Sequence, residues 1–263
     1  MKVQLKLLLN LLWVILFVGN SFAQEQTSFI KLNKSFRGDS KISQDNLGYL
    51  WITKNDGVYK FDGYDFKFES YESIFEEDFS GDRLTFLKKD FRNNIWLSSI
   101  NGKLTKIDST LKKTHFKHSL VKGNRIIKIS AIGNSKNQVW FGSEKGEILK
   151  FNFNTQTLDS ITSIQKSNGE NISISDIKFI NNDTFWVVSS QGNIFKYSIS
   201  LNKISELKLP PNFINQKLYL AIDDNKNLWI AAEYKGLYKY IPESEKFIQY
   251  HNQLASKLIA NKN

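Results

Sequence analysis

The chain has 263 residues, 41% of them hydrophobic and 14% aromatic, and it contains no cysteine. This composition excludes a disordered chain, and the lack of cysteine excludes both a disulfide framework and the anchor of a bacterial lipoprotein. The formal net charge of +10 favours anionic ligands, but the lysines are spread along the chain. We therefore interpret them mainly as solvated strand and loop positions rather than as a dedicated anion site or a nucleic-acid-binding face.

The first 23 residues have the three parts of a secretory signal peptide. A short positive region (1–6) precedes an apolar run (7–18), and a small-x-small cleavage pattern follows at 21–23. We expect cleavage after Ala23 and a periplasmic or secreted mature protein. The alternative is an uncleaved signal anchor, for which the apolar run is short and is interrupted by Asn10. Export without cysteine fits a bacterial protein better than a eukaryotic extracellular one.

Five of the six tryptophans recur with gaps of 45, 44, 46 and 43 residues. A glycine follows six residues after each of the first four and seven residues after the fifth. A period of about 40–50 residues is the length of one four-stranded propeller blade. The sequence therefore predicts an all-β protein, a β-propeller with four-stranded antiparallel blades, of which five repeats are visible. The recurring residues, interpreted as structural, are Trp51, Trp96, Trp140, Trp186, Trp229, Gly57, Gly102, Gly146, Gly192 and Gly236.

The predicted propeller spans residues 24–250, and residues 251–263 form a spacer or the start of a further blade. The last unit shows the blade pattern most clearly. Strand-like runs at 218–222, 228–232, 237–241 and 246–250 are separated by turns rich in Asp, Asn, Gly or Pro. The five predicted blades cover about 29–75, 76–120, 121–165, 166–210 and 211–250.

The recurring tryptophan is interpreted as the ring that fills the wedge between neighbouring blades, because a ligand-stacking residue should break the repeat rather than obey it. A lysine follows the tryptophan by nine residues in the first unit and by ten in the others. We interpret this lysine as a solvent-facing strand residue. The five lysines are Lys60, Lys106, Lys150, Lys196 and Lys239.

No catalytic, metal or cofactor site stands out. The three histidines, His115, His118 and His251, have no cysteine or carboxylate pair beside them to complete a metal shell. Paired acids at 76–77 and 223–224 lie in predicted turns, where solvated charges are expected. Serine pairs at 98–99 and 189–190 lack a nucleophile elbow and a histidine partner. We predict no catalytic residue, no metal and no cofactor, and the ligand-binding residues are left open.

The first unit carries a characteristic series of residues: Asp45, Gly48, Trp51, Ile52, Thr53, Gly57, Val58, Tyr59, Phe61, Asp62, Gly63 and Phe66. This series, together with residues 229–240 of the fifth unit, resembles the two-component-regulator propeller repeat. Units two to four diverge from it, and the resemblance extends over about 29–250.

The resemblance implies the periplasmic ectodomain of a sensor, as in the hybrid histidine kinases of Bacteroidetes, some of which detect glycan fragments. Those ectodomains usually have two seven-bladed propellers, followed by a membrane span and a kinase or DNA-binding output. This chain shows five units and none of those later parts. We therefore expect the N-terminal portion of a longer sensor, with its blades belonging to a seven-bladed ring. A complete five-bladed propeller is the alternative.

The expected function is non-catalytic sensing of a carbohydrate or other solute, with signalling through a missing or separate output module. Its expected partners are a glycan or small-solute ligand and a signalling partner or downstream kinase module, with contact to the membrane only through a signal anchor or a missing segment. Any kinase activity would belong to a downstream portion. The alternatives are an exported propeller enzyme of hydrolase or lactonase type, and a protein-binding scaffold.

Overall fold

A computed structural model describes residues 40–54, 56–76, 83–116, 121–122, 125–165, 169–213, 217–233 and 235–250. The predicted signal peptide and the 251–263 segment lie outside these ranges, as do His118 and His251. The predicted boundaries of the signal peptide, the blades and the spacer stay predictions.

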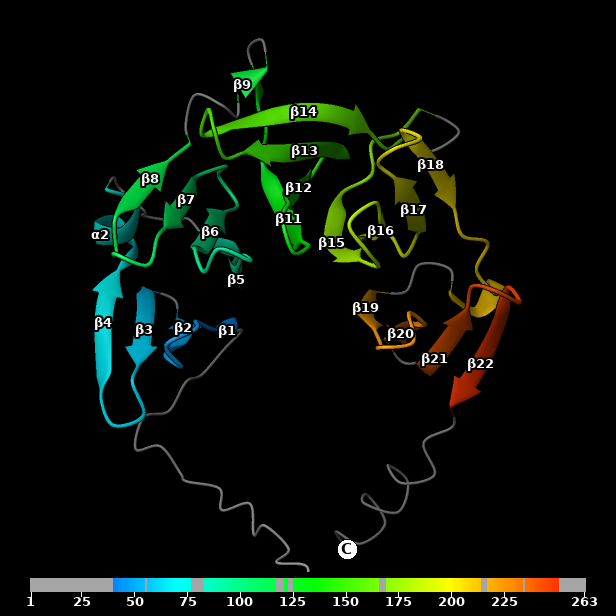
Figure 1. Cartoon of the computed structure of the whole chain (residues 1–263), viewed down its shortest axis with the longest axis horizontal. Coiled ribbons are helices and arrows are strands. Elements are labelled where there is room, and N and C mark those ends of the chain that lie inside the picture. Colours follow the sequence, from blue (N-terminus) through cyan, green and yellow to red (C-terminus); the bar gives the residue numbers. More distant parts are fainter. Residues whose placement is uncertain are drawn as a thin grey trace, which may run out of the picture. The chain divides into compact units, whose positions relative to one another are not determined.

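The described chain folds into five four-stranded sheets, and in each sheet the strands pair antiparallel in chain order (Figure 1). Alternating apolar residues and tight turns favour such meanders. The all-β prediction of four-stranded antiparallel propeller blades is confirmed. The first sheet contains β1 (Ile42–Gln44), β2 (Leu50–Thr53), β3 (Gly57–Phe61) and β4 (Phe66–Ser70). The second contains β5 (Leu84–Lys89), β6 (Ile95–Ser99), β7 (Leu104–Ile107) and β8 (Lys113–His115).

The remaining sheets repeat this plan. The third contains β11 (Ile129–Asn134), β12 (Val139–Ser143), β13 (Glu147–Asn152) and β14 (Thr157–Ser163). The fourth contains β15 (Ile174–Phe179), β16 (Thr184–Ser189), β17 (Ile194–Ser198) and β18 (Lys203–Glu206). The fifth contains β19 (Leu218–Ile222), β20 (Leu228–Ala232), β21 (Gly236–Ile241) and β22 (Lys246–Tyr250), close to the strands predicted for the last unit.

Within the described residues, short elements lie between three pairs of sheets. A two-stranded ribbon, β9 (Val121–Lys122) and β10 (Arg125–Ile126), lies between the second and third sheets in the sequence, and the 3-10 turn η2 (Pro211–Phe213) precedes the fifth. The helix α2 (Tyr71–Phe75) follows the first sheet and was not predicted. Its buried residues Tyr71, Ile74 and Phe75 pack into the core between the first two sheets.

The first strand of each sheet contacts the first strand of the next, in the series β1, β5, β11, β15 and β19. We call these five the inner strands. The apolar core of the described residues also lies between successive sheets. It consists of four clusters, each built from residues of two neighbouring sheets. Hydroxyl groups add direct ties between inner strands. Thr85 Oγ1 donates to the Ile129 carbonyl at 3.1 Å, and Ser130 Oγ donates to the Ile174 carbonyl at 2.5 Å.

The recurring glycines serve two different purposes. Gly102, Gly146, Gly192 and Gly236 have φ between 84° and 91°, which glycine adopts without steric cost. Gly57 instead allows close approach, because a Cβ atom there would lie 2.2 Å from the Glu69 carbonyl oxygen on the neighbouring strand β4.

Candidate ligand site at the ends of the inner strands

Four of the recurring tryptophans, Trp51, Trp96, Trp140 and Trp186, lie in the apolar clusters between successive sheets, whereas Trp229 is only partly buried. The Trp96 ring is 5.0 Å from both Phe141 and Phe151 of the third sheet. The Trp140 ring is 5.3 Å from Phe185 of the fourth sheet. Both indoles are almost fully buried, so they hold successive sheets together and are not accessible to a solute.

An aspartate six residues before the tryptophan anchors the indole in three of the sheets. The Nε1 groups of Trp51, Trp96 and Trp229 donate to the carboxylates of Asp45, Asp90 and Asp223 at 3.0, 2.7 and 3.0 Å. The same carboxylates accept backbone N–H groups and so close the turn between the first two strands. Asp223 is therefore a structural acceptor, not merely the solvated turn residue that the sequence suggested.

The acceptor differs in the other two sheets. Gln138 Oε1 takes its place for Trp140, at 3.1 Å. Among the described residues, the buried Nε1 of Trp186 has no hydrogen-bond acceptor. The signal for the aspartate anchor was its constant spacing from the tryptophan, which the sequence interpretation did not connect to the indole.

The recurring lysines lie opposite the tryptophans on the third strand of each sheet. The ammonium groups of Lys60, Lys150, Lys196 and Lys239 lie 5.3–5.9 Å from the ring centres of their tryptophans, a cation–π distance. For Lys106 the predicted solvent-facing position is wrong. It is only 8% exposed, lies over the Phe151 ring of the next sheet and donates to Gln156. Burial lowers the pKa of its ammonium group.

The ends of the inner strands carry side chains that the core does not use. In the second to fifth sheets, the carbonyl of the residue just before the inner strand accepts the backbone N–H of the residue just after the second strand, at 2.7–3.0 Å. The accepting residues are Arg83, Lys128, Ser173 and Lys217, and the donating residues are Ile100, Glu144, Ser190 and Glu233. In the first sheet, Lys41 accepts from Thr53 at 3.0 Å. Four of these five accepting residues are therefore cationic.

The residues that pair through their backbones at these ends differ in charge from sheet to sheet. In the third sheet Lys128 is paired through its backbone with Glu144, and in the fifth sheet Lys217 is paired with Glu233. The fourth sheet has a serine at both positions. In the first and second sheets the backbone partners of Lys41 and Arg83 are the uncharged residues Thr53 and Ile100.

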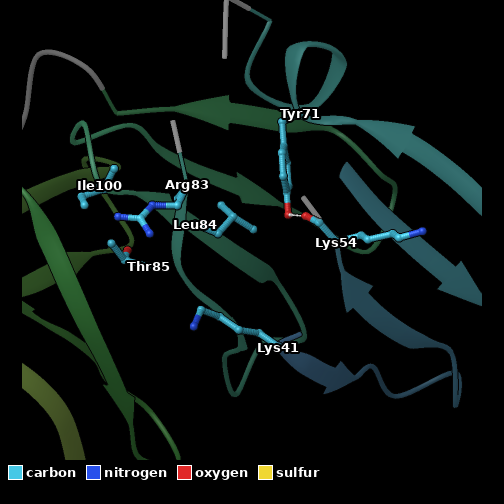
Figure 2. A pocket seen from close by; sticks show the side chains of 7 residues that line it. All are labelled: Lys41, Lys54, Tyr71, Arg83, Leu84, Thr85 and Ile100. Carbon is cyan, nitrogen blue, oxygen red and sulfur yellow. Dashed lines mark hydrogen bonds between the residues drawn. The ribbon is translucent and has the colours of Figure 1, made fainter. Parts of the chain in front are cut away.

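A cavity of about 340 Å³ lies at this end of the first and second sheets (Figure 2). Figure 2 shows Lys41 and Arg83 on the same side of the cavity, with Thr85 and Ile100 beside the guanidinium. The Lys54 ammonium extends away from that side, toward the Tyr59 ring at 5.8 Å. The complete lining is Lys41, Lys54, Tyr71, Arg83, Leu84, Thr85 and Ile100.

The polar wall of the cavity is fixed by the short helix. Tyr71 is 3% exposed and its hydroxyl donates to the Lys54 carbonyl at 2.6 Å. Burial raises the pKa of the Tyr71 phenol, and the charge of Asp56 on the β2–β3 turn raises it further, so the phenol stays protonated at neutral pH. The lining thus combines three basic side chains with the protonated Tyr71 phenol and the apolar side chains of Leu84 and Ile100. That arrangement suits binding, and no nucleophile paired with a base is present among its lining residues.

The histidine and the acids considered from sequence form no site in the described residues. His115 Nδ1 shares a hydrogen bond with Thr105 at 2.9 Å, and its Nε2 lies 3.3 Å from Glu76. Within the described ranges, no group of three His, Cys, Asp or Glu residues is placed to hold a metal ion. Likewise, none of the described helices has the length and apolarity needed to cross a membrane.

The sequence matched no family model and no curated protein. Solved structures match the fold. One is the extracellular domain of BT3049 from B. thetaiotaomicron, described as a hybrid two-component system, with TM-score 0.61, 18% identity, and coverage of 81% of this chain and 30% of that one. The extracellular domain of BT4673 from the same organism is described likewise. It gives a TM-score of 0.55 at 18% identity, and the match covers 86% of this chain and 35% of that one. This chain therefore spans about a third of the length of these two domains.

An enzyme has a similar structure. An H270A virginiamycin B lyase from Staphylococcus aureus, crystallised with quinupristin, gives a TM-score of 0.65 at 16% identity and covers 85% of this chain and 73% of that one. At such identities the likeness concerns the fold alone. Together with the five antiparallel sheets, it establishes that the described chain has the β-propeller fold.

Proposed function

We propose that the chain is a non-catalytic, ligand-binding domain of an exported two-component-type sensor, and that ligand binding is signalled through a separate or downstream output module. The observation that carries this proposal is the cavity between the ends of β1 and β5, which is lined for binding and lacks a catalytic pair. Its support is the fold shared with the extracellular domains of BT3049 and BT4673, together with the signal-peptide pattern of the sequence.

The proposed ligand is a carbohydrate or another small solute, because a cavity of about 340 Å³ is at the lower end of the usual size for small-molecule sites. The test is calorimetric titration of the purified protein with a panel of neutral and acidic sugars, followed by chromatography of the recovered ligand. We expect saturable binding and an unchanged ligand. Chemical conversion of the ligand would contradict the proposal.

A matched pair of variants locates the binding. Ile100→Trp places a large ring in the cavity, whereas Ser190→Trp makes the same change at the corresponding position of the fourth sheet. We expect the first variant to abolish binding and the second to retain it. Loss of binding in both, or in neither, would place the ligand elsewhere.

An exported propeller enzyme is the second candidate, favoured by the structural likeness to the virginiamycin B lyase. Incubation with quinupristin, with and without a chelator, tests it directly. Product formation would favour the enzyme, and its absence under conditions where a lyase control is active would remove this particular activity.

A further inference from the structure

We infer that the fifth sheet binds the first sheet of a second copy of this chain, so that copies associate head to tail. We call the face of each sheet that carries its recurring tryptophan the tryptophan face, and the other one the opposite face. The proposed contact joins the tryptophan face of the fifth sheet to the opposite face of the first. It concerns contacts between copies and is therefore independent of the ligand cavity.

The four contacts between successive sheets all join the same two faces. Side chains of neighbouring residues in a strand point to opposite faces, so the residue beside a tryptophan marks the opposite face of its sheet. Trp96 shares its apolar cluster with Phe141, the neighbour of Trp140 in the third sheet. The other three clusters pair Trp51 with Leu97, Trp140 with Phe185, and Trp186 with Ile230. Each tryptophan face thus packs on the opposite face of the next sheet.

The tryptophan face of the fifth sheet is apolar and exposed. Directly paired residues of antiparallel strands lie on one face, so the register gives two rows across this sheet. The rows are Tyr219, Ala231, Leu237 and Tyr250, and Ala221, Trp229, Lys239 and Ile248. Tyr219, Leu237, Ile248 and Tyr250 are 39–53% exposed. The single charge of the two rows is the Lys239 ammonium, which lies 3.7 Å from Asp223 of its own sheet.

Comparison with the other sheets shows that such a face is normally covered. Leu237 pairs with the residue two positions after the tryptophan, and it is 39% exposed. The residues at the same register position in the first four sheets are at most 2% exposed. They are Val58, Leu104, Ile148 and Ile194. An exposed apolar patch of this kind marks a surface for another protein element.

The opposite face of the first sheet has the matching property. Ile42 on its inner strand pairs with the residue just after the tryptophan and is 63% exposed. The residues at the same position in the other four sheets are at most 6% exposed. They are Leu87, Ile132, Ile177 and Leu220. Phe68 lies at the other end of the same row and is 43% exposed.

A second copy supplies the covering sheet for each of these faces. Leu237 and Ile42 both stay exposed in one molecule, so its own first and fifth sheets do not cover each other there. The first sheet of another copy presents the kind of face that covers every other tryptophan face in this chain. Because the contact joins two different faces, it is heterologous and leaves one face of each kind for further copies.

The experiment is sedimentation velocity of the purified protein over a wide range of concentration. We expect dimers and larger species to increase with concentration. Leu237→Glu and Ile42→Glu should each weaken association by at least about tenfold, because each places an unpaired charge in an apolar contact. Leu201→Glu is the control, since Leu201 is 73% exposed between β17 and β18 and lies outside both faces. It should associate like the parent.

An equimolar mixture of the two variants tests the direction of the contact. Leu237→Glu keeps an intact first sheet and Ile42→Glu an intact fifth sheet, so the mixture should form a dimer and grow no further. Thermal melts show whether each variant is folded. Tyr219→Glu and Phe68→Glu, on the same two faces, provide a second pair for the same mixing test.

Three outcomes overturn the inference. The first is a parent protein that stays monomeric at every concentration. The second is association that survives Ile42→Glu but is lost in Leu237→Glu, because two fifth sheets would then pack together. The third is a mixture of folded variants that stays monomeric. The ligand titrations proposed above are unaffected by any of these results.

Discussion

At the scale of single residues, the buried carboxylate of Asp90 binds several donors at once. It accepts the Trp96 indole, the Asn94 side chain and the backbone N–H groups of Arg92 and Asn94, and Asp90 is 2% exposed. Removing it leaves several buried donors without an acceptor, and each such donor costs about 1–3 kcal/mol.

We therefore expect Asp90→Ala to lower the free energy of unfolding by about 2–4 kcal/mol. Urea denaturation followed by tryptophan fluorescence measures the loss. Asp159→Ala, an exposed position on β14, serves as the control and should change it by less than about 0.5 kcal/mol. Similar losses in both variants would contradict the buried role of Asp90.

The corresponding aspartate of the fifth sheet, Asp223, predicts how the stability of the fold depends on pH. Partial burial would by itself raise the pKa of Asp223, but hydrogen bonds from Trp229 and Asn227 and the nearby Lys239 ammonium hold it at about 2. Because the folded pKa lies below the ordinary value of 3.8, the carboxylate stabilises the fold above about pH 4. That stabilisation is lost as the pH falls toward 2.

Thermal melts between pH 2 and 7 test this titration. Asp223→Asn should be less stable than the parent at neutral pH, and the difference should shrink toward pH 2. Asp224→Asn, at the exposed neighbouring position, should follow the parent curve. A difference that stays constant across the pH range would remove Asp223 from the acid-sensitive groups.

At the scale of elements, the strands of a blade could be predicted because each one is a short apolar run bounded by turn residues. The strands of the last unit show this, since the runs at 218–222 and 228–232 coincide with β19 and β20. The helix α2 escaped prediction because five residues are too few to show a helical period, and its burial depends on the second sheet.

The candidate site was missed for a related reason. Lys41 and Arg83 lie 42 residues apart, so only the pairing of β1 with β2 and of β5 with β6 reveals that they occupy matching strand ends. The sequence did contain a weak signal, since Arg83, Lys128 and Lys217 are spaced by 45 and 89 residues, close to one and two repeat lengths. What it did not contain was the backbone pairing that brings the ends of β1 and β5 to one cavity.

The lysines that recur on the third strand of each sheet differ in burial, and this difference predicts how much each one contributes to stability. Lys106 on β7 is buried against Phe151, whereas Lys196 on β17 is exposed. We expect Lys106→Ala to cost about 1–2 kcal/mol through lost stem packing, and Lys196→Ala to cost less than about 0.5 kcal/mol. Chemical denaturation of the pair measures the difference. Equal effects would show that Lys106 is solvated after all.

At the scale of the whole molecule, the core consists of separate apolar clusters between successive sheets rather than one continuous cluster. Each cluster is shared by two neighbouring sheets, and Trp140 belongs to the cluster between the third and fourth sheets. Such nearest-neighbour packing makes stability close to a sum of local terms. A core mutation should therefore act mainly on the two sheets that share its cluster.

We expect Trp140→Ala to lower stability by about 3–5 kcal/mol. Hydrogen exchange should show the greatest loss of protection in the third and fourth sheets. The matched control is Trp229→Ala, because Trp229 is only partly buried and contacts Tyr250 and Lys239 of its own sheet. It should cost about 1–2 kcal/mol. Uniform loss of protection across all five sheets would contradict the local model.

The residue that precedes an inner strand contributes its main-chain carbonyl to the fold, and every amino acid supplies that group. Arg83, Lys128, Ser173 and Lys217 already occupy this position in four sheets with the same backbone bond. Natural or designed variation at these sites can therefore change the chemistry presented to a solute without weakening the scaffold. The tryptophan positions hold the sheets together, and the residues before the inner strands form a row of interchangeable side chains through which new specificities can evolve.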